Sequence, residues 1–130
     1  KDPFNKTAYF LQKDLDIIAM NEACQYIIGK QDFTSFSKVN TQTFTNNCDV
    51  MFAKWELVNN KLTFTIKADR FLRNMVRAIV GTLLDVGFGK IIAADVAKII
   101  AAKDRSKSGV SVPAHALFLT EVQYPNKKRI

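Results

Sequence analysis

The strongest constraint on the fold is a pair of alternating runs between positions 50 and 68. Apolar side chains recur at every second position, as Met51, Ala53, Trp55 and Leu57 in the first run and Leu62, Phe64, Ile66 and Ala68 in the second. Asn59 and Asn60 separate the runs, and asparagine tolerates the positive φ angles of tight hairpin turns. Because successive side chains of a strand point to opposite faces, the pattern predicts a β-hairpin with one buried and one polar face.

A first helix is predicted before the hairpin, over residues 14–28. Its apolar residues recur at helical spacing, as Ile17, Met20, Cys24, Ile27 and Ile28. Asp14 is the predicted N-cap and Gly29 the predicted end of this helix. We expect Cys24 to point into the core, which is the usual environment of an isolated thiol.

Two more helices and a final strand are predicted after the hairpin. Residues 70–86 form the first of these helices, with Asp69 as its N-cap and Gly87 at its end. Residues 92–103 form the next helix, and residues 116–124 form a strand whose apolar start suits the inside of a sheet. This order of elements predicts an α+β fold, in which a mostly antiparallel sheet carries helices packed on one face.

Composition and charge narrow the class of protein. The 130 residues suit one domain, and a hydrophobic fraction of 48% argues against disorder. No apolar run approaches the length of a membrane span, and the N-terminus lacks the pattern of a signal peptide. With two cysteines, a reducing, cytoplasmic setting is the simpler expectation. The net charge of +7 favours an acidic partner such as nucleic acid.

The residue types available for catalysis or metal binding are few. His115 is the only histidine, so a zinc site with two histidine ligands is excluded. Any Ser-His-Asp or Cys-His site within this chain would have to use His115, which we expect to be a surface residue. Cys24 and Cys48 lie too far apart in sequence for a Cys-x-x-Cys pair. The sequence predicts no metal site and no cofactor.

Three arginines, Arg70, Arg73 and Arg77, fall on the side of the predicted helix 70–86 that is opposite its apolar face. Such a stripe is either a solvated surface or a site where a partly buried guanidinium pairs with a carboxylate or phosphate. Gly81 continues the stripe by one turn. Glycine inside a helix costs about 1 kcal/mol relative to alanine, so we expect another segment to approach the backbone there.

Aromatic and basic residues alternate in the polar stretch from Gln31 to Asn47, which is predicted as a long connection. Phe33 and Phe36 lie between Lys30 and Lys38. Bases of RNA stack on such rings while cations follow the phosphates. The alternative, that both rings anchor the connection in the core, is the stronger expectation. The pattern alone therefore predicts a basic α+β domain that is a plausible RNA-binding module.

Five segments of the chain also resemble a known family, in its order and spacing. They are Asp32-Phe33-Thr34-Ser35-Phe36, the helix from Phe71 to Gly81, Ala101-Ala102-Lys103-Asp104-Arg105, Pro113-Ala114 leading to Leu117-Phe118-Leu119, and Tyr124-Pro125. They resemble the C-terminal half of the tRNA pseudouridine synthase A family, whose members isomerise uridines in the tRNA anticodon stem-loop. The pattern Phe-Leu-x-x-Met-Val-Arg-x-x-Val-Gly is the specific signal. The family usually has glycine where this chain has Ala116.

The resemblance implies a role for several side chains. Arg77 matches an arginine that acts as counter-ion to the catalytic aspartate and lowers the pKa of that carboxyl group. Leu117 matches an apolar residue of the base pocket, with Phe71 and Met75 supporting its wall. Basic residues are expected to contact RNA phosphates, namely Lys30, Lys38, Arg70, Arg73, Lys103, Arg105 and Lys107. The family's reaction needs no metal or cofactor.

The family's catalytic aspartate lies in an Arg-Thr-Asp-Ala-Gly-Val-His stretch, which this sequence does not contain. The resemblance therefore predicts that residues 1–130 are the C-terminal domain of a synthase, half of the full fold with a ferredoxin-like subdomain. We expect the piece to be inactive alone, and its first residue, which is not methionine, fits a cut from a longer protein. Its expected partners are tRNA, the N-terminal half of the same enzyme and a second copy in a homodimer, with no membrane. A stand-alone RNA-binding module and a dimerisation domain remain as alternatives.

Overall fold

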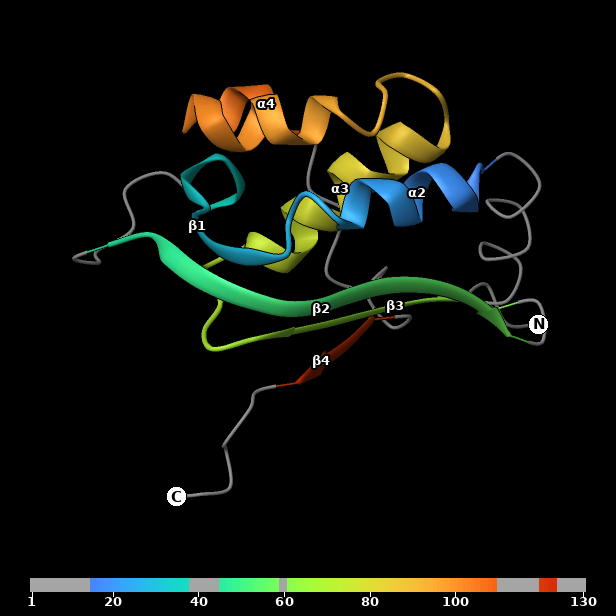
Figure 1. The fold of residues 1–130 in the computed structure, drawn as a ribbon, viewed down its shortest axis with the longest axis horizontal. Helices are drawn as coiled ribbons and strands as arrows, with labels where there is room; N and C mark the ends of the chain where they lie inside the picture. The colour runs from blue at the N-terminus through green and yellow to red at the C-terminus, as the bar shows by residue number, and fades with distance from the viewer. Residues whose placement is uncertain (1–14, 38–44, 59–60, 110–119, 124–130) are drawn as a thin grey trace.

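Helices cover one face of a four-stranded sheet in the computed structural model, which describes residues 15–37, 45–58, 61–109 and 120–123 (Figure 1). The elements in chain order are α2 (Ile17–Cys24), β1 (Gly29–Asp32), the 3-10 helix η1 (Thr34–Phe36), β2 (Asn47–Val58), β3 (Lys61–Ala68), α3 (Met75–Gly87), α4 (Asp95–Ala102), the 3-10 helix η2 (Arg105–Lys107) and β4 (Thr120–Gln123). The α+β class and the one-sided helix layer are confirmed. None of the described helices is long and apolar enough to cross a membrane.

The described strands follow the order β1-β2-β3-β4. The first three are antiparallel neighbours, and β4 runs parallel to β3. Within the described residues β4 pairs with β3 alone, so the prediction that this strand lies inside the sheet is wrong there. The apolar start of the predicted strand, residues 117–119, lies outside the described residues. Strand β1 was not predicted, because its four residues are too polar to show an alternating pattern.

The predicted hairpin is present, but a β-bulge interrupts its first strand. Val50 is opposite Ala68 and Phe52 is opposite Lys67, so Met51 is the additional residue. Met51 was predicted on the buried face and is 43% exposed instead. Beyond the bulge the alternation resumes as far as Trp55, whose ring packs on that of Phe64 with centroids 4.8 Å apart, but Leu57, predicted in the same apolar set, is 42% exposed. A bulge changes which face each residue occupies, and alternation alone does not reveal it.

The core lies between the sheet and the helices. Its largest fully buried side chains include those of Phe33, Phe36 and Phe64, so the interpretation of Phe33 and Phe36 as core anchors is confirmed. Cys24 is buried as predicted, and Cys48 is buried too. Burial raises the pKa of Cys24 to about 12 and that of Cys48 to about 11, because the thiolate is poorly solvated in an apolar interior.

Helix α2 is shorter than predicted. Asp16 is its N-cap and accepts a 3.0 Å hydrogen bond from the backbone N–H of Ala19, whereas Asp14 lies outside the described residues. The helix ends at Cys24, and Gly29 begins β1 with a φ of 109°. Ile28 was predicted in the apolar face but is 38% exposed, because it lies after the end of the helix.

Asn21 joins α2 to the open edge of β2. Strand β1 pairs with β2 only as far as Val50, so the following residues of β2 have no strand on that side within the described part of the chain. The Asn21 side chain fills this gap at Trp55. Its Oδ1 accepts from the Trp55 N–H at 2.7 Å and its Nδ2 donates to the Trp55 carbonyl at 3.0 Å. The amide thus replaces a neighbouring strand at this point of the edge.

Helices α3 and α4 both begin later than predicted. Residues 70–74 precede α3, and Asn74 occupies its N-cap with a φ of 68°. Asp69 is not a cap, because its Oδ1 accepts from the Asp49 N–H at 2.8 Å and so serves the sheet. The predicted three-arginine stripe on one helix is therefore wrong, since only one of the three, Arg77, lies within α3.

Candidate nucleic-acid interface

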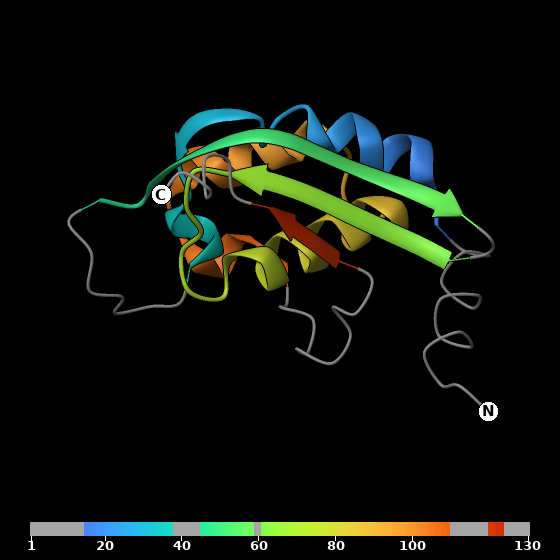
Figure 2. The same cartoon turned by 90° about the horizontal axis from the view of Figure 1, so that it is seen from below.

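Segments that carry the family resemblance meet at one corner of the molecule. The 3-10 helix η1, from the Asp32–Phe36 motif, contacts α3, the end of α4 and η2. Figure 2 shows η1 beside the start of α3 and the last turn of α4. The loop from Lys103 to Gly109, called the 103–109 loop below, lies at the same corner and contains η2. Motifs about 70 residues apart in sequence are thus neighbours in space.

Ser35 joins η1 to the end of α4. Its hydroxyl donates to the carbonyl of Ile99 at 2.6 Å and accepts from the backbone N–H of Asp104 at 2.8 Å. Ser35 is fully buried, so both bonds form away from water. The hydroxyl fixes where the polypeptide leaves α4 and enters the 103–109 loop.

Asp32 closes the turn that leads into η1. Its Oδ1 accepts hydrogen bonds from the backbone N–H of Thr34 at 2.8 Å and from the Thr34 hydroxyl at 2.5 Å. Burial by itself would raise the pKa of Asp32, but the two bonds from Thr34 and the positive charge of Lys103 together lower it below its usual value. Asp32 is therefore an anionic neighbour of Lys103 at this corner.

The 103–109 loop is fixed along its length. The Oδ1 of Asp104 accepts from the N–H and the hydroxyl of Ser106, at 2.9 Å and 2.8 Å. These bonds lower the pKa of Asp104. The guanidinium of Arg105 donates to the hydroxyl of Ser108 and, at 3.0 Å, to the carbonyl of Gly109.

The end of the loop lies against α3. The Gly109 N–H donates to the hydroxyl of Thr82 at 2.8 Å. A side chain at position 109 would come within 3.1 Å of the backbone of Gly81. The expected close approach of another segment to Gly81 is therefore confirmed, and the approaching residue is Gly109.

The arginines of the predicted stripe occupy three different settings. Arg70 is partly buried and donates from Nη1 to the carbonyls of Thr45 and Asn47, at 2.9 Å and 2.8 Å, so it braces the start of β2. Arg73 is exposed, in the segment before α3. Arg77 lies in the first turn of α3 and is partly buried.

The other predicted site residues are only partly described. Met75 is fully buried, with its sulfur 3.8 Å from the Sγ of Cys48, and Phe71 is partly buried. Leu117 and Lys38 lie outside the described residues, as does His115. The exposed lysines at this corner are Lys103 and Lys107, and Lys30 is exposed on β1. The proposed neighbourhood of Arg77 and Leu117 stays a prediction.

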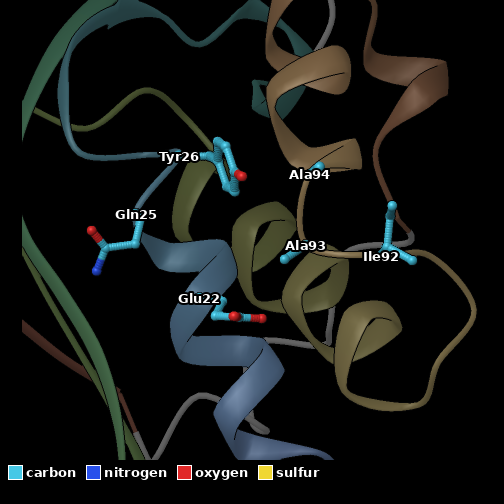
Figure 3. A pocket seen from close by; sticks show the side chains of 6 residues that line it. All are labelled: Glu22, Gln25, Tyr26, Ile92, Ala93 and Ala94. Carbon is cyan, nitrogen blue, oxygen red and sulfur yellow. The ribbon is translucent and has the colours of Figure 1, made fainter.

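Two surface hollows accompany these elements. One, of about 380 Å³, lies between α4 and the 103–109 loop and is lined by Ile91, Asp95, Lys98, Ile99, Ala102 and Lys107. The other, of about 460 Å³, lies where the end of α2 faces the residues before α4. Figure 3 shows Glu22 of α2 and Tyr26, just after the end of α2, on one side of this hollow, with Ala93 and Ala94 on the other. The hollow beside Lys107 belongs to the candidate interface, and the second belongs to a different part of the surface.

Sequence reasoning missed the two hydroxyls that fix this corner, Ser35 and Thr82. Ser35 lies inside a quoted motif, but the pattern does not say what its hydroxyl contacts 69 residues away. Thr82 lies on α3 among apolar residues and is 1% exposed. The available signal was the presence of a hydroxyl on an otherwise apolar helix face, because a buried hydroxyl needs a hydrogen-bond partner.

Comparison with known proteins gives a consistent result. The family model described as tRNA pseudouridine synthase matches residues 23–125. The tRNA pseudouridine synthase A of Parabacteroides distasonis is 55% identical over 128 residues, which is 98% of this chain and 51% of that protein. The protein of the same name from Bacteroides fragilis is 50% identical, with the same coverage, and that from Bacillus licheniformis is 42% identical over 92% of this chain and 48% of that protein.

The chain spans about half the length of the curated relatives it matches. The matched region of the family model includes the corner formed by η1, α3 and the 103–109 loop. It also includes all four described strands. On the extent of this match and the identity to its relatives, the chain belongs to the tRNA pseudouridine synthase family.

Proposed function

We propose that this chain forms the tRNA-binding and active-site-completing part of a pseudouridine synthase that acts on uridines of the tRNA anticodon stem-loop. The observation that carries the proposal is the meeting of η1, α3 and the 103–109 loop at one corner of a chain that belongs to this family. The remaining half of the enzyme supplies the catalytic aspartate. The complete protein works as a homodimer in the cytoplasm.

In the proposed reaction, the target uridine leaves its stack and enters a pocket. An aspartate carboxylate attacks or assists while the bond from the ribose C1′ to N1 breaks and a bond from C1′ to C5 forms. The proton at C5 then leaves and N1, freed from the ribose, takes up a proton, so the product is an isomer of the substrate. The aspartate has to stay ionised next to the base, where burial opposes its charge.

Arg77 is the proposed counter-ion of that aspartate. Its place in the first turn of α3 and its partial burial support this role, because a guanidinium with limited contact with water attracts a carboxylate strongly. Leu117 lines the base pocket in this proposal, and Phe71 and Met75 support the wall. The buried Met75 would act from behind the pocket rather than at its surface.

Activity of the full-length protein that carries this chain tests the proposal. We expect it to convert uridine to pseudouridine in a tRNA anticodon stem-loop, measured by chromatography of the digested nucleosides. Arg77→Ala should lower kcat by about 100-fold or more, the size typical of a lost electrostatic contact in an active site. Lys90→Ala, which removes an exposed cation beyond the end of α3, is the control and should leave kcat unchanged.

A binding module without chemistry is the second candidate, favoured by the exposed Lys103 and Lys107 and by the net charge of +7. If the chain is such a module, the full-length protein binds tRNA and forms no pseudouridine.

The Arg77→Ala variant has a separate outcome. If it forms pseudouridine at the same rate as the unmodified protein, the enzyme assignment stands but the proposed role of Arg77 is wrong.

A further inference from the structure

The 103–109 loop is exposed, yet buried hydroxyls hold it at both ends. At its start, the N–H of Asp104 donates to Ser35. At its end, the N–H of Gly109 donates to Thr82. Ser35 and Thr82 are 0% and 1% exposed, so each hydroxyl sits in the interior and reaches out to a loop backbone group.

Neither hydroxyl is required by packing. A buried hydroxyl is costly unless it is hydrogen-bonded, so an apolar residue would be the ordinary choice at both positions. Thr82 lies in α3 between the buried Gly81 and Leu83. The hydroxyls at positions 35 and 82 each accept a bond from an N–H at one end of the loop, and Ser35 also donates to the carbonyl of Ile99 in α4, so it fixes the loop relative to that helix.

The loop is also braced from within. The Asp104 carboxylate holds Ser106, and the Arg105 guanidinium holds Ser108 and the Gly109 carbonyl. Arg105 was predicted to contact RNA, but here its charged group turns back onto its own loop. Lys103 and Lys107 remain exposed.

Lys103 has a left-handed backbone conformation, with a φ of 51°. Lys103 is the C-cap of α4, and helices commonly end on a residue in this left-handed region. The bond from the next residue, Asp104, to Ser35 therefore lies directly after the end of α4.

We propose that Ser35 and Thr82 are positioning residues for tRNA binding, because they fix the 103–109 loop so that Lys103 and Lys107 meet backbone phosphates. Arg105 is an internal brace of the loop in this arrangement and not a phosphate ligand. The inference rests on the proposed function, and it divides the basic residues of the loop into two roles. A loop that is already ordered loses less conformational entropy when RNA binds, so its anchors raise affinity without touching the ligand.

Binding of the full-length protein that carries this chain to an anticodon stem-loop RNA, measured over a range of salt concentrations, tests the proposal. Lys103→Ala and Lys107→Ala should each make the slope of log K against log salt less negative by about 0.7, the value for one phosphate contact on a single strand. Ser35→Ala and Thr82→Val should lower affinity by about two- to tenfold and reduce the slope in the same direction, because they release the loop that carries both lysines.

Matched variants separate positioning from general stability. Ser37→Ala removes a buried hydroxyl whose bond stays within the same turn, to Thr34, and should leave the salt slope unchanged. Thr82→Ser keeps the hydroxyl and should restore the binding lost in Thr82→Val. In a Lys103→Ala, Lys107→Ala background, Ser35→Ala should cause no further loss of binding.

The outcomes distinguish failure of this inference from failure of the proposed function. If the full-length protein with the unmodified chain does not bind the RNA, the proposed function fails, and the inference with it. If it binds but Ser35→Ala and Thr82→Val keep its affinity and salt slope, only the inference is overturned. If Ser35→Ala does not fold, the comparison of Thr82→Val with Thr82→Ser tests the inference, because these variants change only the anchor at the Gly109 end of the loop. If Ser35→Ala weakens binding equally in the double-lysine background, its effect is structural and the positioning role is wrong.

Discussion

Helix α2 and the 103–109 loop are both attached to the rest of the fold, but by different forces. Helix α2 buries Met20, Ala23 and Cys24 against the sheet and α3, so apolar contact is its main attachment. The loop is largely exposed and is held by hydrogen bonds from Ser35 and Thr82. Apolar burial is non-directional and sets stability, whereas hydrogen bonds fix position with a modest net contribution to stability. Changes to the two regions should therefore have separable effects.

The largest expected effect is in the apolar layer. Phe64→Ala should destabilise the fold by about 3–5 kcal/mol, because it removes a fully buried ring that packs on Trp55 and leaves a cavity. Phe52→Ala, at a ring that is 40% exposed, is the matched control and should cost less than about 1 kcal/mol. Urea unfolding measures both. Equal decreases in the free energy of unfolding would show that burial between the sheet and the helices is not the main source of stability.

The two buried cysteines of the apolar core should make the fold less stable at alkaline pH. The pKa values of Cys24 and Cys48 are raised to about 12 and about 11, so the folded state keeps both thiols protonated after they ionise in the unfolded chain. Stability should fall by about 1.4 kcal/mol per pH unit for each thiol, starting near the unfolded pKa of about 8.5 and ending at the folded pKa. Unfolding of the Cys24→Ala, Cys48→Ala variant measured from pH 8 to 10 should show a smaller slope. An identical slope would mean that the thiols do not titrate as described.

A smaller effect is expected where the side chain of Asn21 attaches α2 to β2. Asn21→Ala leaves the N–H and carbonyl of Trp55 without their amide partner and should cost about 1–3 kcal/mol. Glu22→Ala, at the next and exposed position, is the control and should stay within about 0.5 kcal/mol. Thermal or urea unfolding compares them. A harmless Asn21→Ala would show that water replaces the amide at this edge without penalty.

The smallest expected effect is at the polar corner. Thr34→Val removes the hydroxyl that donates to Asp32, so the pKa of Asp32 should rise towards its usual value. A lowered carboxyl pKa stabilises the fold above the unfolded pKa, and that contribution disappears as pH falls through the folded pKa. The variant should thus lose under about 1 kcal/mol at neutral pH, because this corner is partly exposed to water. Titration of Asp32 by NMR measures the shift, and an unchanged pKa would contradict the assigned cause.

The packed region was the more predictable of the two. Alternation identified β3 and its buried residues Leu62, Phe64 and Ile66, because one-sided burial imposes a period of two. It did not reveal the bulge at Met51, since one inserted residue depends on pairing and not on polarity. The start of α3 was misplaced because Asp69, a good cap by type, is instead used by the N–H of Asp49.

Prediction of the polar corner depended on the family resemblance. The quoted motifs singled out the segments that contain η1, α3 and the start of the 103–109 loop, but not that these meet in space or how they are joined. The bond between Ser35 and Asp104 spans 69 residues, and no local pattern encodes such a contact. The bond from Arg105 to the Gly109 carbonyl was likewise not predicted from its residue type, and its contact with RNA stays a prediction.

Amide hydrogen exchange of the full-length protein that carries this chain, with and without an anticodon stem-loop RNA, tests the central claim most directly. The account predicts that RNA protects the amides of residues 32–37, of residues 103–109 and of the first turn of α3, while α2 and the hollow beside Tyr26 stay unchanged. Protection confined to α2 and the residues before α4, with none in the 103–109 loop, would contradict it.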